Sequence, residues 1–261
     1  MAINNVPPAP LHRGRQIPRA RKTAETVARQ LVADIVSRRL PPNSPLPPES
    51  AMLDEYGVSR ASLREALRIL EVHGLLTIKS GPHGGPRSAA IDASDFGTMA
   101  TFYYHTTHTT FAELAEARLC IEPMTARLAA QHATDADFEA LSANITAAKA
   151  LTSTGNDEPG DERRIVDLSR AFHGLVAQMA GNRVLTLIGS SFEEIFSVYS
   201  TDSLGAVENR RAVRMHERIA EALLDHDGDR AEALMRDHLT ATNKDLVRRH
   251  PSLFSSIVEW I

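Results

Sequence analysis

Apolar side chains recur every three or four residues in two short segments around Gly57, a pattern typical of two packed helices. The first helix is expected to begin at Pro48, since proline suits the first helical position, and to end at Gly57, because glycine readily adopts a left-handed conformation. The second is expected to begin after Ser59, whose hydroxyl can cap it, and to pack through Leu63 and Leu67. These segments predict a helix-turn-helix.

The second segment also carries a row of arginines on another face. Arg60, Arg64 and Arg68 are four residues apart, so one side of a helix would be cationic. Such a row can simply solvate a surface helix, but guanidinium groups also pair with guanine edges or phosphates in the major groove. A β-prone run over 75–79 and a glycine- and proline-rich tip over 81–86 follow, as in a wing. We therefore expect a winged helix-turn-helix that binds double-stranded DNA.

Beyond the wing, the pattern is almost wholly helical. Thr110 and Glu113 form a predicted capping box, Thr134 is a predicted cap, and residues 152–162 read as a loop. Helices are expected over 95–105, 110–132, 134–151, 162–180, 182–200, 207–226 and 228–249. Short connections make an antiparallel helical bundle the simplest architecture, so the fold class is mainly α.

Charge separates the two parts of the chain. Residues 1–90 contain 13 Lys and Arg against 7 Asp and Glu, whereas the remaining residues contain 16 against 26. A basic N-terminal part followed by an acidic remainder is expected when one domain faces DNA and the other does not. The predicted organisation is a disordered basic tail (1–22), a DNA-binding domain (23–91), a helical effector-binding and dimerisation domain (92–250) and a C-terminal tail (251–261). The basic tail can serve as an arm along the phosphates or as a solubilising segment.

Composition sets further bounds on the class of protein. With 261 residues, 43% of them apolar, the chain is long enough for two domains with separate cores. It has no stretch of 18 apolar residues and no charged-then-apolar leader, so we expect a cytoplasmic protein with no membrane partner. The single cysteine, Cys120, lies in an apolar helical pattern, which predicts a buried packing role and excludes an intrachain disulfide.

Three histidines are the informative residues of the bundle. His173, His216 and His238 each lie in the middle of a different predicted helix beside apolar neighbours, so they can converge on one point. Three neutral imidazoles suit a divalent metal, with zinc or nickel favoured, and leave positions for water or an anion. Mid-helix histidines are also common as hydrogen-bonded core or surface residues. His105 and His108 are expected on the surface.

Four short motifs identify the N-terminal segment. Residues 46–49, 57–60, 64–67 and 74–75 read LPPE, GVSR, REAL and GL. With them, residues 24–90 resemble the DNA-binding domain of the GntR family of bacterial transcription regulators. Ser50 stands where family members usually carry an arginine, so one expected DNA contact is missing. The DNA-binding residues that the resemblance implies are Ser50, Ser59, Arg60, Ser62, Arg64, Arg68, Lys79 and His83.

The helical part resembles the FCD domain of the FadR-like branch of that family. The markers are Arg118 with Glu122, Phe172 with His173, Gly181 with Asn182, and His216 with His238. In many such domains three histidines and an aspartate bind a divalent metal, to which a carboxylate effector coordinates. Ser169 stands at the aspartate position here. Asp167 cannot replace it, because it lies about 120° around the helix from His173, against about 40° for Ser169.

The resemblance implies a site of three histidines, completed by water or the Ser169 hydroxyl, and a small carboxylate or sugar acid as effector. The alternative is that the histidines hydrogen-bond a ligand directly, without metal. Arg118 can pair with Glu122 or clamp a carboxylate in two-point fashion, and the resemblance favours an effector-binding role. Asn182 is expected to cap a helix or to touch the effector.

The expected function is a ligand-responsive transcription regulator. The resemblance implies a repressor that binds an inverted-repeat operator as a homodimer and is released by its effector. A metal-dependent enzyme is the competing class. It would need a general base near the metal, as in a His-Glu-x-x-His arrangement, and the sequence contains none. We therefore expect no enzymatic activity.

Overall fold

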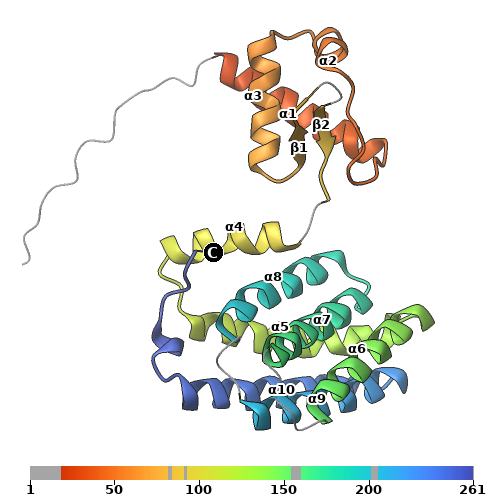
Figure 1. The fold of residues 1–261 in the computed structure, drawn as a ribbon, viewed down its shortest axis with the longest axis vertical. Coiled ribbons are helices and arrows are strands. Elements are labelled where there is room, and N and C mark those ends of the chain that lie inside the picture. Colours follow the sequence, from red (N-terminus) through yellow and green to blue (C-terminus); the bar gives the residue numbers. More distant parts are fainter. Residues whose placement is uncertain (1–18, 82–83, 91–92, 154–159, 201–204, 261) are drawn as a thin grey trace, which may run out of the picture. The chain divides into compact units, whose positions relative to one another are not determined.

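The structure is a computed structural model that describes residues 19–81, 84–90, 93–153, 160–200 and 205–260. The chain divides into two compact units, residues 1–91 and 92–261 (Figure 1). The first contains three helices and a two-stranded sheet among its described residues, and the second is a helical bundle. The mainly α class predicted from the sequence is confirmed.

The first unit is a helix-turn-helix followed by a hairpin. Its elements are α1 (Arg19–Ser37), α2 (Glu49–Tyr56), α3 (Arg60–Val72), β1 (Leu76–Lys79) and β2 (Gly85–Ser88). Gly57 ends α2 at φ 60°, and Ser59 accepts a hydrogen bond from the backbone N–H of Ser62 at 3.2 Å. The predicted turn and cap are therefore confirmed. The helix α1 begins at Arg19, so the last four residues of the segment predicted as a disordered tail are helical instead.

An apolar core and the hairpin hold this unit together. Leu31 of α1, Met52 of α2, Leu63 of α3 and Leu76 of β1 belong to one buried cluster. The strands β1 and β2 pair antiparallel, from Leu76 opposite Ser88 to Lys79 opposite Gly85. The amphipathic pattern of α3 thus buries one face, and the arginine row lies on the other.

Among its described residues, the second unit contains the seven helices expected from the pattern. They are α4 (Ala93–Thr106), α5 (Phe111–His132), α6 (Asp135–Ser153), α7 (Asp161–Met179), α8 (Arg183–Ser200), α9 (Ala206–Leu224) and α10 (Gly228–Arg249). Thr110 and Glu113 form the predicted capping box at the start of α5. Strong caps and glycine-rich turns explain why the observed ends lie within two residues of the predicted ones.

The helix α5 lies at the centre of the bundle and contacts α7, α8, α9 and α10, while α6 packs on α7 and α9 (Figure 1). Phe172, Ile219 and Met235 belong to the main apolar core. Gly189 lets α8 approach α7 closely, because a Cβ there would lie 2.9 Å from the Cβ of Ala177. This close packing brings the inner face of α8 against the inner faces of α5 and α7.

Residues 251–260 are part of the bundle and not a tail, which corrects the prediction of a C-terminal tail from residue 251. They form a 3-10 helix, η1 (Leu253–Ser255), and then run beside the start of α5. Val258 is fully buried in a cluster with Phe111, and its N–H donates to the carbonyl of Thr109 at 2.9 Å. Apolar packing by these last residues is the reason that the segment is ordered. Among the described residues, no helix combines the length and the apolar character needed to cross a bilayer.

Candidate DNA-binding surface and effector pocket

The outer face of α3 presents the arginine row. Arg60, Arg64 and Arg68 are exposed, while Leu63 and Leu67 on the opposite face are buried. The side chain of Arg64 is 69% exposed and its Nε lies 3.4 Å from Oε2 of Glu49. An exposed pair of this length contributes little energy, so Arg64 can exchange it for a phosphate or a base edge.

The other predicted DNA-binding residues are placed differently. Ser50, Ser59 and Lys79 are exposed, as DNA contacts require. Ser62 is buried, with its hydroxyl oxygen 3.1 Å from that of Ser59, because it lies on the inner side of the first turn of α3. We therefore withdraw Ser62 from the DNA-binding set. His83 lies outside the described residues.

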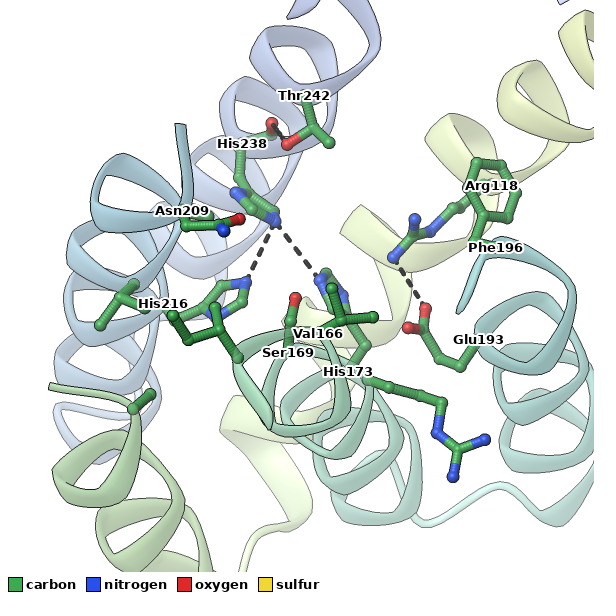
Figure 2. Close-up of a pocket in the computed structure, with 15 residues that line it drawn as sticks. Arg118, Val166, Ser169, His173, Glu193, Phe196, Asn209, His216, His238 and Thr242 are labelled. Carbon is green, nitrogen blue, oxygen red and sulfur yellow. Dashed lines mark hydrogen bonds and ion pairs between the residues drawn. The ribbon is translucent and has the colours of Figure 1, made fainter. Parts of the chain in front are cut away.

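In the second unit, three imidazoles meet inside the bundle. His173 of α7, His216 of α9 and His238 of α10 are all buried. Nε2 of His238 lies 3.1 Å from Nε2 of His216 and 3.3 Å from Nε2 of His173 (Figure 2). The convergence expected from the sequence is therefore present, with the same ring nitrogen of each histidine directed to the centre.

The surroundings keep two of these rings neutral. Burial, and then the other two imidazoles and Arg118, lower the pKa of His216 well below its usual range. Burial, followed by His173 and Arg118, lowers the pKa of His238 in the same direction. The ring of Phe172 also stacks on His216, with centroids 4.0 Å apart. Neutral imidazoles offer lone pairs, which is the form that binds metals.

Glu122 determines which nitrogen of His173 carries hydrogen. Its Oε2 lies 2.7 Å from Nδ1 of His173. Burial alone would raise the pKa of Glu122, but Arg118 and His173 outweigh it and lower that pKa to about 2. An ionised carboxylate can only accept, so Nδ1 of His173 is the donor. In the neutral ring, Nε2 then presents a lone pair to the centre of the histidine cluster.

Arg118 lies at the centre of a buried ionic group. It contacts Glu122 of its own helix, and its Nη2 donates to Oε1 of Glu193 on α8 at 2.7 Å. Its guanidinium carbon also lies 4.6 Å from the ring centre of Phe196. The pairing with Glu122 that the sequence offered is therefore present, although buried. Burial raises the pKa of Glu193 to about 7, since the attraction of Arg118 does not outweigh burial and the nearby charge of Glu122.

The three histidines fit a divalent metal. With metal–nitrogen bonds of about 2.0 to 2.1 Å, two nitrogens of a tetrahedral site lie about 3.3 Å apart. The two Nε2 separations of 3.1 and 3.3 Å are close to this value. Three lone-pair-bearing nitrogens at such distances repel one another unless a proton or a cation lies between them. The donor set is therefore suited to a borderline ion such as Zn²⁺ or Ni²⁺.

A small cavity of about 60 Å³ opens beside the histidine cluster. Its lining combines an apolar wall with a few polar groups (Figure 2). The lining residues are Arg118, Ala148, Ile165, Val166, Ser169, Arg170, His173, Glu193, Phe196, Asn209, Ala212, Val213, His216, His238 and Thr242. The predicted residues Arg118 and Ser169 are thus brought to the histidines. Asp167 is exposed and lies 3.5 Å from Arg163, away from the site as expected.

Comparison with known proteins matches both units. The model of bacterial regulatory proteins of the gntR family covers residues 23–82, and the FCD domain model covers 113–241. The Glc operon transcriptional activator of Escherichia coli K12 is 27% identical over 231 residues, which are 87% of this chain and 89% of that protein. The chain belongs to the GntR family, in its FadR-like, FCD-containing branch. It is a DNA-binding transcription regulator with a ligand-binding FCD domain, and members of this family are not enzymes.

Other members of the GntR family agree with this assignment. The transcriptional repressor NanR of Escherichia coli K12 is 27% identical over 229 residues, covering 85% of this chain and 84% of NanR. The structure of a GntR protein of Streptococcus agalactiae superposes with a TM-score of 0.64 at 22% identity, over 85% of this chain and 99% of that one. This last likeness supports the fold.

Of the two roles expected for Asn182, the helix cap is present: its Oδ1 accepts from the N–H groups of Val184 and Leu185 at the start of α8. It does not line the cavity, so its effector role is dropped. The expectation for Cys120 needs correction. Cys120 is exposed, not buried. It lies about 200° around α5 from the buried Arg118, and therefore on the outer side of that helix.

The pocket also includes Glu193, Phe196, Asn209 and Thr242, which were not predicted from the sequence. A signal existed for Asn209, which precedes His216 by seven residues and so shares its helix face. For Glu193 the signal was weaker, because a carboxylate within an apolar helix reads as a surface residue when its partner is 75 residues away in sequence.

Proposed function

We propose that this GntR-family regulator is a repressor that binds an inverted-repeat operator as a homodimer. In the proposal, a small carboxylate or sugar acid binds at a divalent metal in the FCD domain and releases the protein from DNA. The observation that carries the proposal is the convergence of three buried imidazole nitrogens beside a small cavity.

His173, His216 and His238 would hold the metal, with the Ser169 hydroxyl on the same cavity wall. When bound, the ion supplies positive charge and open coordination positions for an anionic ligand. Serine in place of the family's aspartate leaves that charge less neutralised, which favours a carboxylate. Zinc or nickel is the ion that the imidazole set favours.

The cavity limits the effector to a short molecule. One water needs about 10 to 15 Å³ of such space, so about 60 Å³ holds only a few non-hydrogen atoms. Closure around a ligand can enlarge it somewhat, but a long acyl chain would need many more side chains to move. Within the proposed class, short carboxylic acids are therefore favoured over sugar acids, and both over long-chain acids.

On the DNA side, Arg60 and Arg64 lie on the exposed face of α3 and would enter the major groove. Arg68 lies one turn further along that face, and Lys79 lies at the wing. The proposed roles are base reading or phosphate contact for the arginines and phosphate contact for Lys79. Ser59, which caps α3, and Ser50 are exposed and close to Arg60 in the sequence. Their proposed role is contact with the phosphate backbone of the operator.

An uncharged apolar patch supports the homodimer. Phe96, Met99, Phe102 and Tyr103 of α4 are all exposed, and Trp260 packs edge-on against Phe102 with ring centres 5.6 Å apart. The helix carries no charged side chain from residue 96 to 104. In a two-fold interface such a patch meets its own copy, so the absence of charge avoids like-charge repulsion. A second copy of the chain is therefore the proposed occupant.

Release requires only that the effector prefer one dimer geometry over the other. A preference of about 1 to 3 kcal/mol would change operator affinity roughly 5- to 150-fold. Glu193 and Phe196 of α8 line the cavity, and α4 packs on α8. A ligand that shifts α8 would therefore also move the helix that bears the apolar patch.

Metal analysis tests the proposed site. We expect purified wild-type protein to hold about one divalent ion per chain by elemental mass spectrometry, and His216→Ala to hold far less. The exposed His105 provides a control, because His105→Ala should retain the metal. Absence of metal from the wild type after incubation with zinc or nickel would contradict the metal-dependent part of the proposal.

A further inference from the structure

Asn209 is a buried amide that faces the cavity. It lies on α9, seven residues before His216, so the two residues share one face of the helix two turns apart. It is only 4% exposed and lines the cavity, and Figure 2 shows its side chain extending from α9 toward His238. Its side-chain amide makes no hydrogen bond within the described part of the chain, and it is not among the fully enclosed unpaired atoms, so it reaches the open space of the cavity. A polar group that is nearly buried and has no protein partner is uncommon and calls for an explanation.

Two other polar groups of the same cavity are already paired. The hydroxyl of Thr242 donates to the carbonyl of His238 at 3.0 Å, and Glu193 accepts from Arg118 at 2.7 Å. Next to Asn209 on the cavity wall lie the apolar side chains of Ala212 and Val213. The amide therefore provides two donors and one acceptor on a wall that is otherwise apolar.

We propose that Asn209 is a specificity-determining residue that selects a short hydroxylated carboxylic acid. The carboxylate of this ligand would lie at the histidine cluster, and its hydroxyl would hydrogen-bond the Asn209 amide. The inference rests on the proposed function, since it assumes an acid in this cavity. A neutral amide on an apolar wall suits a neutral hydroxyl, whereas a second carboxylate there would need a cation.

This arrangement discriminates against acids that lack the hydroxyl. An alkyl group against Asn209 would leave the buried amide unpaired in the complex and deprive it of any water it held before. The resulting penalty corresponds to a preference of roughly 10- to 100-fold for the hydroxylated acid. Because Asn209 is not one of the three histidines, the affinity for metal should not depend on it.

Calorimetric titration of the zinc-loaded full-length chain tests this role with two matched pairs, lactate against propionate and 3-hydroxybutyrate against butyrate. We expect wild type to prefer the hydroxylated member of at least one pair by about 10-fold or more. Asn209→Leu, which keeps the side-chain shape, should reduce that preference to about threefold or less. Thr240→Val is the control, because its hydroxyl donates to the carbonyl of Arg236 at 2.7 Å and the residue does not line the cavity, so it should keep the preference. Asn209→Ala provides a second variant should the leucine perturb folding.

The outcomes separate the two levels of the proposal. An undiminished preference in Asn209→Leu and Asn209→Ala would overturn the role of Asn209 and leave the acid-binding function standing. Failure of all four acids to bind zinc-loaded wild type would overturn the acid effector itself, and the role of Asn209 with it. A fall in zinc affinity in both Asn209 variants, measured by competition with a chelator, would show that they act through the metal site and would also overturn the specificity role.

Discussion

Replacement of Glu122 by glutamine tests whether a second carboxylate positions the metal-binding histidines. The variant keeps the size of the side chain but removes the charge that accepts from Nδ1 of His173 at 2.7 Å. Both side chains are less than 10% exposed, so water cannot substitute for the lost contact. A glutamine can also present its amide N–H₂ to Nδ1, which would move the ring hydrogen to Nε2 and remove the lone pair from the centre of the site.

The expected loss follows from the size of such contacts. Removal of a partner that orients a metal-binding histidine costs about 10- to 100-fold in metal affinity, or about 1.4 to 2.7 kcal/mol. We expect the upper part of this range, because the same residue also fixes the tautomer of His173. Glu193→Gln is the matched control. It changes the other carboxylate partner of Arg118 but makes no hydrogen bond to His173, so zinc affinity should change by about threefold or less.

Zinc affinity is measured by competition with a chromogenic chelator at neutral pH, and circular dichroism checks that each variant is folded. A zinc affinity of Glu122→Gln within about threefold of wild type would refute the reasoning. An equal loss in Glu193→Gln would show that the ionic group as a whole, and not the orientation of His173, controls the site.

Three further predictions concern other parts of the molecule. Arg64→Ala should weaken operator binding by about 1 to 3 kcal/mol and relax the preference at one position of each half-site. Arg64→Lys should keep part of the affinity but not the preference, and unchanged values by fluorescence anisotropy would remove Arg64 from the reading surface. The raised pKa of Glu193 means that its contribution to stability is complete below about pH 4.5 and is lost as pH rises through about 7. Glu193→Gln should therefore gain stability over wild type between about pH 5 and pH 8, by up to about 3 kcal/mol, in urea unfolding with a chelator present, and parallel pH profiles would contradict this. Tyr103→Arg should shift the chain toward monomer in sedimentation velocity, whereas Leu224→Arg, at another exposed apolar residue, should not.

Helices and turns were predictable because their signals are local. Gly57 ends a helix through its own backbone freedom, and Ser59 and Thr110 cap helices through hydrogen bonds to residues three positions away. The repeat of apolar residues then determines which face packs. The same local logic placed His216 and His238 on inward faces, and the structure brings both to His173.

Features that depend on distant partners were not predictable in the same way. The ionic group of Arg118 requires Glu193, which comes from a helix far along the chain. Cys120 was assigned to the interior because its segment is apolar on several sides, yet its own direction on α5 is outward. The C-terminal segment was predicted as a tail because its anchoring apolar residues, among them Val258 and Phe254, give no periodic pattern.

The central claim is that the histidine cluster of the FCD domain controls DNA binding through an acid ligand. The most direct measurement is fluorescence anisotropy of a duplex selected by the protein from a random library, titrated with zinc-loaded wild type and His238→Ala. Addition of a short hydroxylated acid should weaken the binding of wild type about 5- to 150-fold and leave His238→Ala unchanged. An equal response of the two proteins, or no response of wild type to any short acid in the presence of metal, would contradict the account.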